Sequence, residues 1–142
     1  MTAPLLVLSV SGLCGCTPTG STAALRTAHE AVATYFRGVG AHRCSQAAIS
    51  LRPQLRSGFL YAPDSDCNNT LGVEKVSITV SPAPFAKASY PGYTEIQQAT
   101  VSYDATHRQV FAAQSGHQFR FIYVGRQGSV GPWEILEIGT GP

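Results

Sequence analysis

The chain has 142 residues, of which only 13% are charged, and its formal net charge is +2. A charge this close to zero leaves no basic surface of the kind that nucleic-acid binding needs, so nucleic acid is excluded as a partner. The length allows one domain with one hydrophobic core and leaves no room for a second.

The N-terminal segment contains an uncharged apolar stretch, Pro4–Leu13, followed closely by a cysteine. The stretch has the length of the hydrophobic region of a secretory signal and is too short to span a bilayer as a helix. Leu13, Gly15 and Cys16 resemble the lipobox of bacterial lipoproteins, in which the cysteine is acylated and becomes the new N-terminus. The resemblance implies a lipid on Cys16 and a place on the outer face of the cell membrane. A cleaved signal without lipid and a buried N-terminal strand are the alternatives.

Four cysteines are present in the whole chain. Processing at the lipobox would remove Cys14 and acylate Cys16, which leaves Cys44 and Cys67. An even number of cysteines outside the cytoplasm predicts a disulfide, and two separate buried thiols are the alternative. The pattern is a poor match to the paired ligands of a zinc site, so we predict no metal and no other cofactor.

The first half of the chain has helical spacing. Over residues 22–39 apolar side chains recur at three- and four-residue intervals, which predicts an amphipathic helix with Ser21 as its N-cap. A shorter helix is predicted over residues 43–51. Pro53 then opens a turn, and a capped helical turn carries Cys67.

The second half of the chain changes to a period of two, which predicts strands at residues 73–81, 94–104, 117–125 and 133–138. The first three of these strands each have a face on which apolar residues gather, and these residues are Val76, Ile78 and Val80; Ala99, Val101 and Tyr103; and Phe119, Phe121 and Tyr123. Helices followed by strands predict an α+β domain in which the N-terminal helices pack on one face of an antiparallel sheet.

A family resemblance rests on two short segments and on the order of the elements. The opening helix ends in the aromatic pair Tyr35-Phe36, and the last strand is preceded by Gly131-Pro132. These features resemble the NTF2-like fold, also called cystatin-like or SnoaL-type, over residues 22–142, and in particular small actinobacterial lipoproteins with this fold. The resemblance implies a strongly curved sheet that wraps the long helix into a cone. The domain would follow a signal peptide of residues 1–15 and a tether of residues 16–21.

The resemblance implies no single activity, because the fold hosts isomerases, hydrolases and non-catalytic binding domains. Enzymes of this type use a few acid–base side chains inside the cone. His117 shares the aromatic face of its strand and is the candidate catalytic residue, with a partly exposed histidine at the sheet edge as the alternative. Asp104 and His107 have a spacing that suits a solvated turn. Further inward candidates are His29, Tyr35, Tyr103 and Glu134.

Six aromatic residues are candidates to line a pocket for an apolar ligand, unless they form the core: Tyr35, Phe36, Phe119, Phe121, Tyr123 and Trp133. Because acidic residues are sparse, we expect a non-catalytic, membrane-anchored, extracytoplasmic domain that binds a partner protein or a small apolar ligand. The alternative is a small SnoaL-type hydrolase or isomerase that uses polar groups inside the cone. A homodimer would use the exposed sheet face, and the residues there, if not simply solvated, are Gln98, Thr100 and Arg120.

Overall fold

A computed structural model describes residues 25–111 and 114–140. Helices come first in the chain: α1 (Ala28–Gly40), α2 (Cys44–Ala48), α3 (Pro53–Tyr61) and α4 (Asp66–Asn69). The predicted lipobox, tether and helix cap Ser21 lie outside these ranges. No helix within them is long and apolar enough to cross a membrane.

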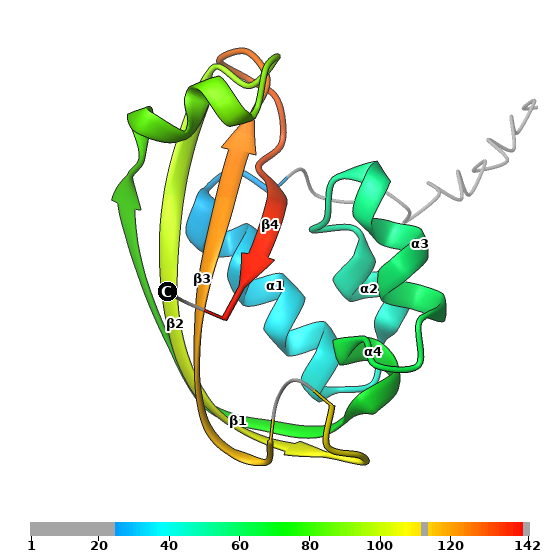
Figure 1. Ribbon diagram of the computed structural model, residues 1–142. Helices are drawn as coiled ribbons and strands as arrows, with labels where there is room; N and C mark the ends of the chain where they lie inside the picture. Colours follow the sequence, from blue (N-terminus) through cyan, green and yellow to red (C-terminus); the bar gives the residue numbers. More distant parts are fainter. Residues whose placement is uncertain (1–24, 112–113, 141–142) are drawn as a thin grey trace, which may run out of the picture.

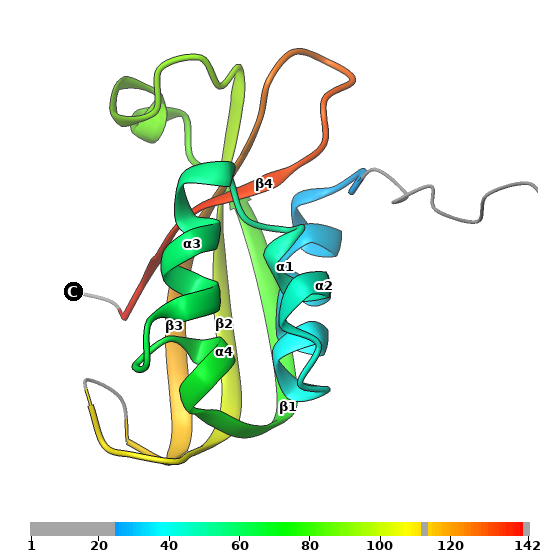
Figure 2. The same cartoon turned by 90° about the vertical axis from the view of Figure 1, so that its right-hand side faces the viewer.

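The sheet follows the helices and has four strands: β1 (Thr70–Pro82), β2 (Glu95–His107), β3 (Gly116–Arg126) and β4 (Glu134–Gly139). A 3-10 helix, η1 (Pro84–Ser89), connects β1 to β2. The strands lie in the order β1-β2-β3-β4, and every neighbouring pair is antiparallel. Helices α1 to α4 lie on one side of this sheet (Figure 1), and Figure 2 shows α3 and α4 in front of it. The predicted α+β class is confirmed.

The expected cone is wrong. Strands β1 and β4 are the two ends of the strand order and do not pair with each other, so the sheet is neither closed nor strongly curled. The edge of β4 is instead met by the chain after α2, where Leu51 forms a parallel bridge with Ile135. The chain after α2 thus occupies the edge of β4 that would otherwise be free to pair, and its backbone bonds to Ile135 satisfy that edge.

Helix α1 begins later than its apolar period predicts. Residues 25–27 are not helical, and the N-cap is Thr27, whose side chain accepts a hydrogen bond from the backbone N–H of Glu30 at 3.0 Å. The Glu30 carboxylate accepts in return from the backbone N–H of Thr27 at 3.2 Å. This capping box satisfies two backbone donors at the helix start and therefore overrides the apolar spacing before it.

At a bulge in β1, the side chains that face the helices change from odd-numbered to even-numbered positions. Its register shifts between Glu74 and Ser77, where Lys75 takes a φ of 53°. The shift places Val73 and Val80 against the same core although they are an odd number of residues apart, and it leaves Val76 exposed. Val76 and Ile78, which the sequence predicts to share a face, both border a groove between α1 and β1, and the bulge changes the period of the strand.

Strand β3 faces the opposite way from the prediction. Ile122 lies opposite Ala99 on β2, and both are fully buried against the helices. The aromatic residues of the alternate positions therefore lie on the side of the sheet that has no helices, where Phe119 is 56% exposed. The outer face is covered only at one end, by a small cluster of Ala83, Ala86, Tyr90, Ile96 and Leu136 beside η1.

The predicted disulfide is present. Cys44 at the start of α2 is bonded to Cys67 in α4, with their Cα atoms 5.5 Å apart and 23 residues apart in sequence. Closing a loop of this size restricts the unfolded chain and stabilises the fold by about 3 kcal/mol in the chain-entropy model. The bond also fixes Cys67, the neighbour of Asp66 in the sequence. Asp66 lines the site described below.

Helices α1 and α2 approach closely at a glycine. A Cβ added to Gly38 would lie 2.7 Å from the backbone nitrogen of Ala47, and the carbonyl of Gly38 accepts from the N–H of Arg43 at 2.8 Å. No flexible side chain can yield there, because the obstructing atoms are the backbone and the Cβ of Ala47. Gly38 therefore sets the distance between the two helices.

We expect Gly38→Ala to lower the free energy of unfolding by about 1–3 kcal/mol, because α2 must shift away from α1. Gly58→Ala in α3 is the matched control, since a Cβ there meets nothing within 4 Å. The same substitution should raise stability there by roughly 0.5–1 kcal/mol, through lower chain entropy in the unfolded state. Urea unfolding of both variants measures the difference, and equal effects would contradict the close contact.

Candidate functional site

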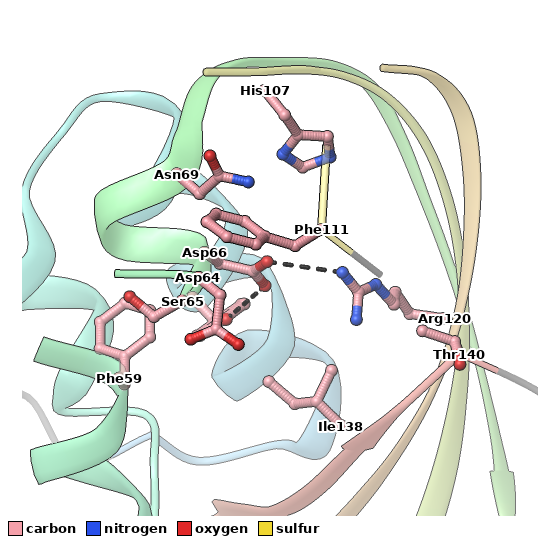
Figure 3. Close-up of a pocket in the computed structure, with 11 residues that line it drawn as sticks. Phe59, Asp64, Ser65, Asp66, Asn69, His107, Phe111, Arg120, Ile138 and Thr140 are labelled. Carbon is pink, nitrogen blue, oxygen red and sulfur yellow. Dashed lines mark hydrogen bonds and ion pairs between the residues drawn. The ribbon is translucent and has the colours of Figure 1, made fainter. Parts of the chain in front are cut away.

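A pocket of about 270 Å³ lies between the helical layer and the sheet. Figure 3 shows Asp66 of α4 and Arg120 of β3 meeting across it, with Ile138 of β4 below them. The chain before α4 contributes Asp64 and Ser65, and the end of β2 contributes His107. The apolar part of the lining comes mainly from Phe59, Phe111 and Ile138.

An ion pair links the two layers at the pocket. Arg120 Nη2 lies 3.4 Å from Asp66 Oδ1, and both side chains are largely buried, at 13% and 18% exposed. The Tyr35 hydroxyl donates to Asp66 Oδ2 at 2.7 Å, and Arg120 Nε donates to the Tyr103 hydroxyl oxygen at 3.0 Å. Four side chains from α1, α4, β2 and β3 therefore form one connected network, which we call the Asp66 network.

The network sets the protonation of its members. Burial, together with the neighbouring Asp66 carboxylate, raises the pKa of Tyr35 well above its usual value. Burial also raises the pKa of Tyr103, although the charge of Arg120 opposes this effect. Burial of the Arg120 guanidinium tends to lower its pKa, but Asp66 together with the hydroxyl groups of Tyr103 and Tyr35 outweighs burial and raises it. Both phenols thus stay protonated and act as hydrogen-bonding groups, while Arg120 stays charged.

Local hydrogen bonds position Asp66. Ser65 is the N-cap of α4, and its side chain accepts from the N–H of Asn68 at 3.3 Å. The Asn68 side chain donates to the carbonyl of Ala62 at 2.8 Å and so holds the chain before the helix. Because Cys67 is bonded to α2 as well, the carboxylate of Asp66 has a fixed approach to the sheet.

His107 lies on the inner side of β2 and lines the pocket. Both of its ring nitrogens are buried, and neither has a hydrogen-bond partner among the residues that the structure places. The segment after it is held to α4, because the Asn69 side chain accepts from Gln109 N at 3.0 Å and donates to Gln109 O at 2.9 Å. A buried imidazole without partners is unusual and points to a ligand or water at this position.

The expectation that Asp104 and His107 share a solvated turn is wrong. Asp104 lies on the outer face of the sheet, 2.9 Å from Lys75 and 2.8 Å from His117. His107 has the same strand parity as Tyr103 and therefore faces inward. Counting in twos from Tyr103 would have found it, but the turn-like composition after it suggested that the strand ended earlier.

His117, the predicted catalytic candidate, is not at the pocket. Its side chain is 55% exposed on the outer face, where it pairs with Asp104 and lies edge-to-face against Phe119. This pairing, together with that of Lys75, lowers the pKa of Asp104. The structure therefore gives His117 the position of the alternative, a partly exposed histidine near the sheet edge.

The six predicted pocket-lining aromatic residues are divided among four places. Only Tyr35 lines the pocket of Figure 3. Phe36 is a core residue that also borders a groove between α1 and β1, and Trp133 is buried beneath the guanidinium of Arg126 at 5.3 Å. The remaining three lie along the outer face of β3: Phe119, Phe121 and Tyr123.

Other candidates are also separated from the pocket. His29 lies on the exposed side of α1, and Glu134 accepts a hydrogen bond from the Tyr93 hydroxyl at 2.9 Å. Gln98 and Thr100 lie opposite the outward aromatic residues of β3, as expected for the helix-free face. Arg120 does not join them, because it faces the helices. Within residues 25–111 and 114–140, no group of three His, Cys, Asp or Glu side chains is arranged to hold a metal ion.

Comparisons with protein-family models, with curated proteins and with solved structures gave no match to this chain. The chain is therefore described by its own geometry: an α+β domain with N-terminal helices on a four-stranded antiparallel sheet.

We expect Tyr35→Phe to lower the free energy of unfolding by about 1–2 kcal/mol, because it removes a donor from the buried Asp66 carboxylate. Tyr61→Phe is the matched control, since Tyr61 is 80% exposed, and its change should stay within about 0.5 kcal/mol. Urea unfolding at neutral pH measures both.

The difference in stability between wild type and Tyr35→Phe should also depend on pH. The pKa of Tyr35 is raised above its ordinary value of 10.0 in the folded state. As the pH rises through that value, the unfolded phenol ionises while the folded one does not, so the stabilisation from Tyr35 is lost. The advantage of wild type over Tyr35→Phe should therefore shrink in alkaline solution, whereas a constant difference would contradict the buried hydrogen bond.

Proposed function

We propose that the protein is a membrane-anchored, extracytoplasmic binding domain that takes a small ligand in the pocket beside the Asp66 network. The observation that carries this proposal is the buried His107 imidazole, whose ring nitrogens have no partner among the described residues, at a pocket that also presents a charged guanidinium. Leaving buried polar groups unpaired is unfavourable, so a bound molecule with a donor and an acceptor would stabilise the site.

The anchoring part of the proposal rests on the sequence. Cys16 follows an apolar stretch with the spacing of a lipobox, and the disulfide between Cys44 and Cys67 supports the same compartment. Disulfides persist outside the reducing cytoplasm and are rare within it. The resemblance to small actinobacterial lipoproteins belongs to this proposal.

A small SnoaL-type hydrolase or isomerase is the alternative, and it would use His107 in the same pocket. A catalytic imidazole is commonly oriented by a carboxylate or carbonyl that fixes its tautomer. His107 has no such partner in the described ranges, and burial keeps the neighbouring Tyr35 from acting as a base. A binding role needs neither feature, so the geometry favours it.

A protein partner is a second candidate function, favoured by the outer face of the sheet. Phe85 and Phe119 are 70% and 56% exposed there, beside the partly exposed Phe121 and Tyr123. Contiguous exposed apolar side chains of this kind are typical of interaction surfaces. A homodimer through this face falls within the same candidate function.

The anchor is tested by metabolic labelling with a palmitate analogue in the native host. Wild type should carry the label and fractionate with the membrane, whereas Cys16→Ser should lose both properties, because the acyl group is the anchor. Cys14→Ser is the matched control and should keep both. Membrane-bound Cys16→Ser without label, or label that depends on Cys14 alone, would contradict the proposal.

The pocket is tested by side-chain NMR of the histidines during a screen of small anionic, cationic and neutral fragments. Compounds that bind should shift the ring signals of His107 and leave those of the outward His117 unchanged. A library that spans these charge classes and moves no His107 signal would contradict a binding role for this pocket.

A further inference from the structure

The pocket offers groups of both charges. Arg120 donates from Nε and Nη2 to Tyr103 and Asp66. Its second terminal nitrogen has no partner among the described residues and can bind an acceptor, since a guanidinium carries five N–H groups. Asp64 also lines the pocket, and its carboxylate has no hydrogen-bonding or ionic partner among the residues of the two described ranges. Figure 3 shows Asp64 and Arg120 on opposite sides of the same space.

The charged side chains that line the pocket disfavour the binding of a ligand with a single charge. A carboxylate alone would find the N–H groups of Arg120 but would also face the negative charges of Asp64 and Asp66. An ammonium group alone would pair with Asp64 but would leave the remaining terminal nitrogen of Arg120 without an acceptor and would lie near its positive charge. A molecule with both poles satisfies the two sides together, and the two ring nitrogens of His107, which have no partner among the described residues, can hydrogen-bond to it as well.

The volume of the pocket and its apolar lining limit the class of ligand further. The volume of about 270 Å³ lies just below the range of roughly 300–1,000 Å³ typical of pockets for drug-sized ligands. Phe59, Phe111 and Ile138 form an apolar wall that suits a short aliphatic side chain. These dimensions fit a molecule the size of an amino acid.

We propose that the pocket binds a small zwitterion with an aliphatic side chain, an α-amino acid, with its carboxylate on Arg120 and its ammonium group on Asp64. This inference rests on the proposed function and names the ligand class for the same pocket. No covalent step is involved.

Three probes of matched shape test the class: L-leucine, 4-methylpentanoate, which lacks the ammonium group, and 3-methylbutylamine, which lacks the carboxylate. Calorimetric titration of the full chain should show saturable binding of leucine. Each single-pole probe should bind about tenfold or more weakly than leucine, because one charged hydrogen-bonding group is left unpaired. NMR should show that leucine shifts the ring signals of His107.

Asp64→Asn is the informative variant, because this exposed side chain makes no bond within the placed residues and its removal leaves the Asp66 network intact. It should weaken leucine about tenfold and leave the binding of 4-methylpentanoate unchanged or stronger. Asp104→Asn on the outer face is the matched control and should leave leucine binding unchanged.

Failure of the ligand class and failure of the pocket give different results. One outcome is that leucine, 4-methylpentanoate and 3-methylbutylamine all shift His107 and bind with equal affinity. In that case the pocket binds ligands, but the proposal that its ligand is a zwitterion is overturned. If Asp64→Asn keeps full leucine affinity, the assignment of the ammonium partner is overturned. If leucine does not bind, or shifts only His29 at the α1 surface, the inference is wrong, and the fragment screen then decides the proposed function separately.

Discussion

The buried carboxylate of Asp66 is the group on which the arrangement of the two layers depends. It accepts a hydrogen bond from Tyr35 on α1 and lies against Arg120 on β3, which in turn donates to Tyr103 on β2. A buried ion pair adds little net stability, because desolvation offsets most of the attraction. Removing one partner is nevertheless costly, since the other charge is then left unpaired. The network therefore fixes the geometry of the helices relative to the sheet more than it stabilises the fold.

Several local features lead to the position of Asp66. Gly38 lets α2 approach α1 closely, and the Cys44–Cys67 disulfide then holds α4 against α2. Ser65 caps α4, so that the helix begins at Asp66. Each feature is short-ranged, yet together they bring an acidic side chain to a sheet residue 54 positions away in the sequence. The pocket exists beside this contact because Arg120 is held there by one side of its guanidinium and keeps the other side free.

The sequence predicts well those features that depend on local patterns. The order of helices and strands, the inward face of β2 at Val101 and Tyr103, and the disulfide all follow from spacing and from cysteine arithmetic. The inward face of β3 does not, because both of its faces carry apolar residues. Phe119 and Phe121 alternate with Ile122, and hydrophobicity alone favours the aromatic side. Only the pairing of Ile122 with Ala99 decides the register.

The candidate site was less predictable than the fold for a physical reason. A buried Arg reads as a solvated residue in a sequence, and its burial depends on partners contributed by distant elements, here Asp66 and Tyr103. His107 is the last residue of β2, and the end of this strand cannot be located from composition. The sequence did indicate that Tyr35 belongs to the inner surface, and this is the one predicted pocket residue that the structure places at the pocket.

Side-chain NMR of Arg120 tests most directly whether the Asp66 network holds its guanidinium in place. In a spectrum of arginine N–H groups, Arg120 should give separate terminal N–H signals that exchange slowly with water. Arg37 on the exposed side of α1 is the internal reference and should give averaged, rapidly exchanging signals. If Arg120 behaves like Arg37, its guanidinium is not held, and the account of the pocket is contradicted.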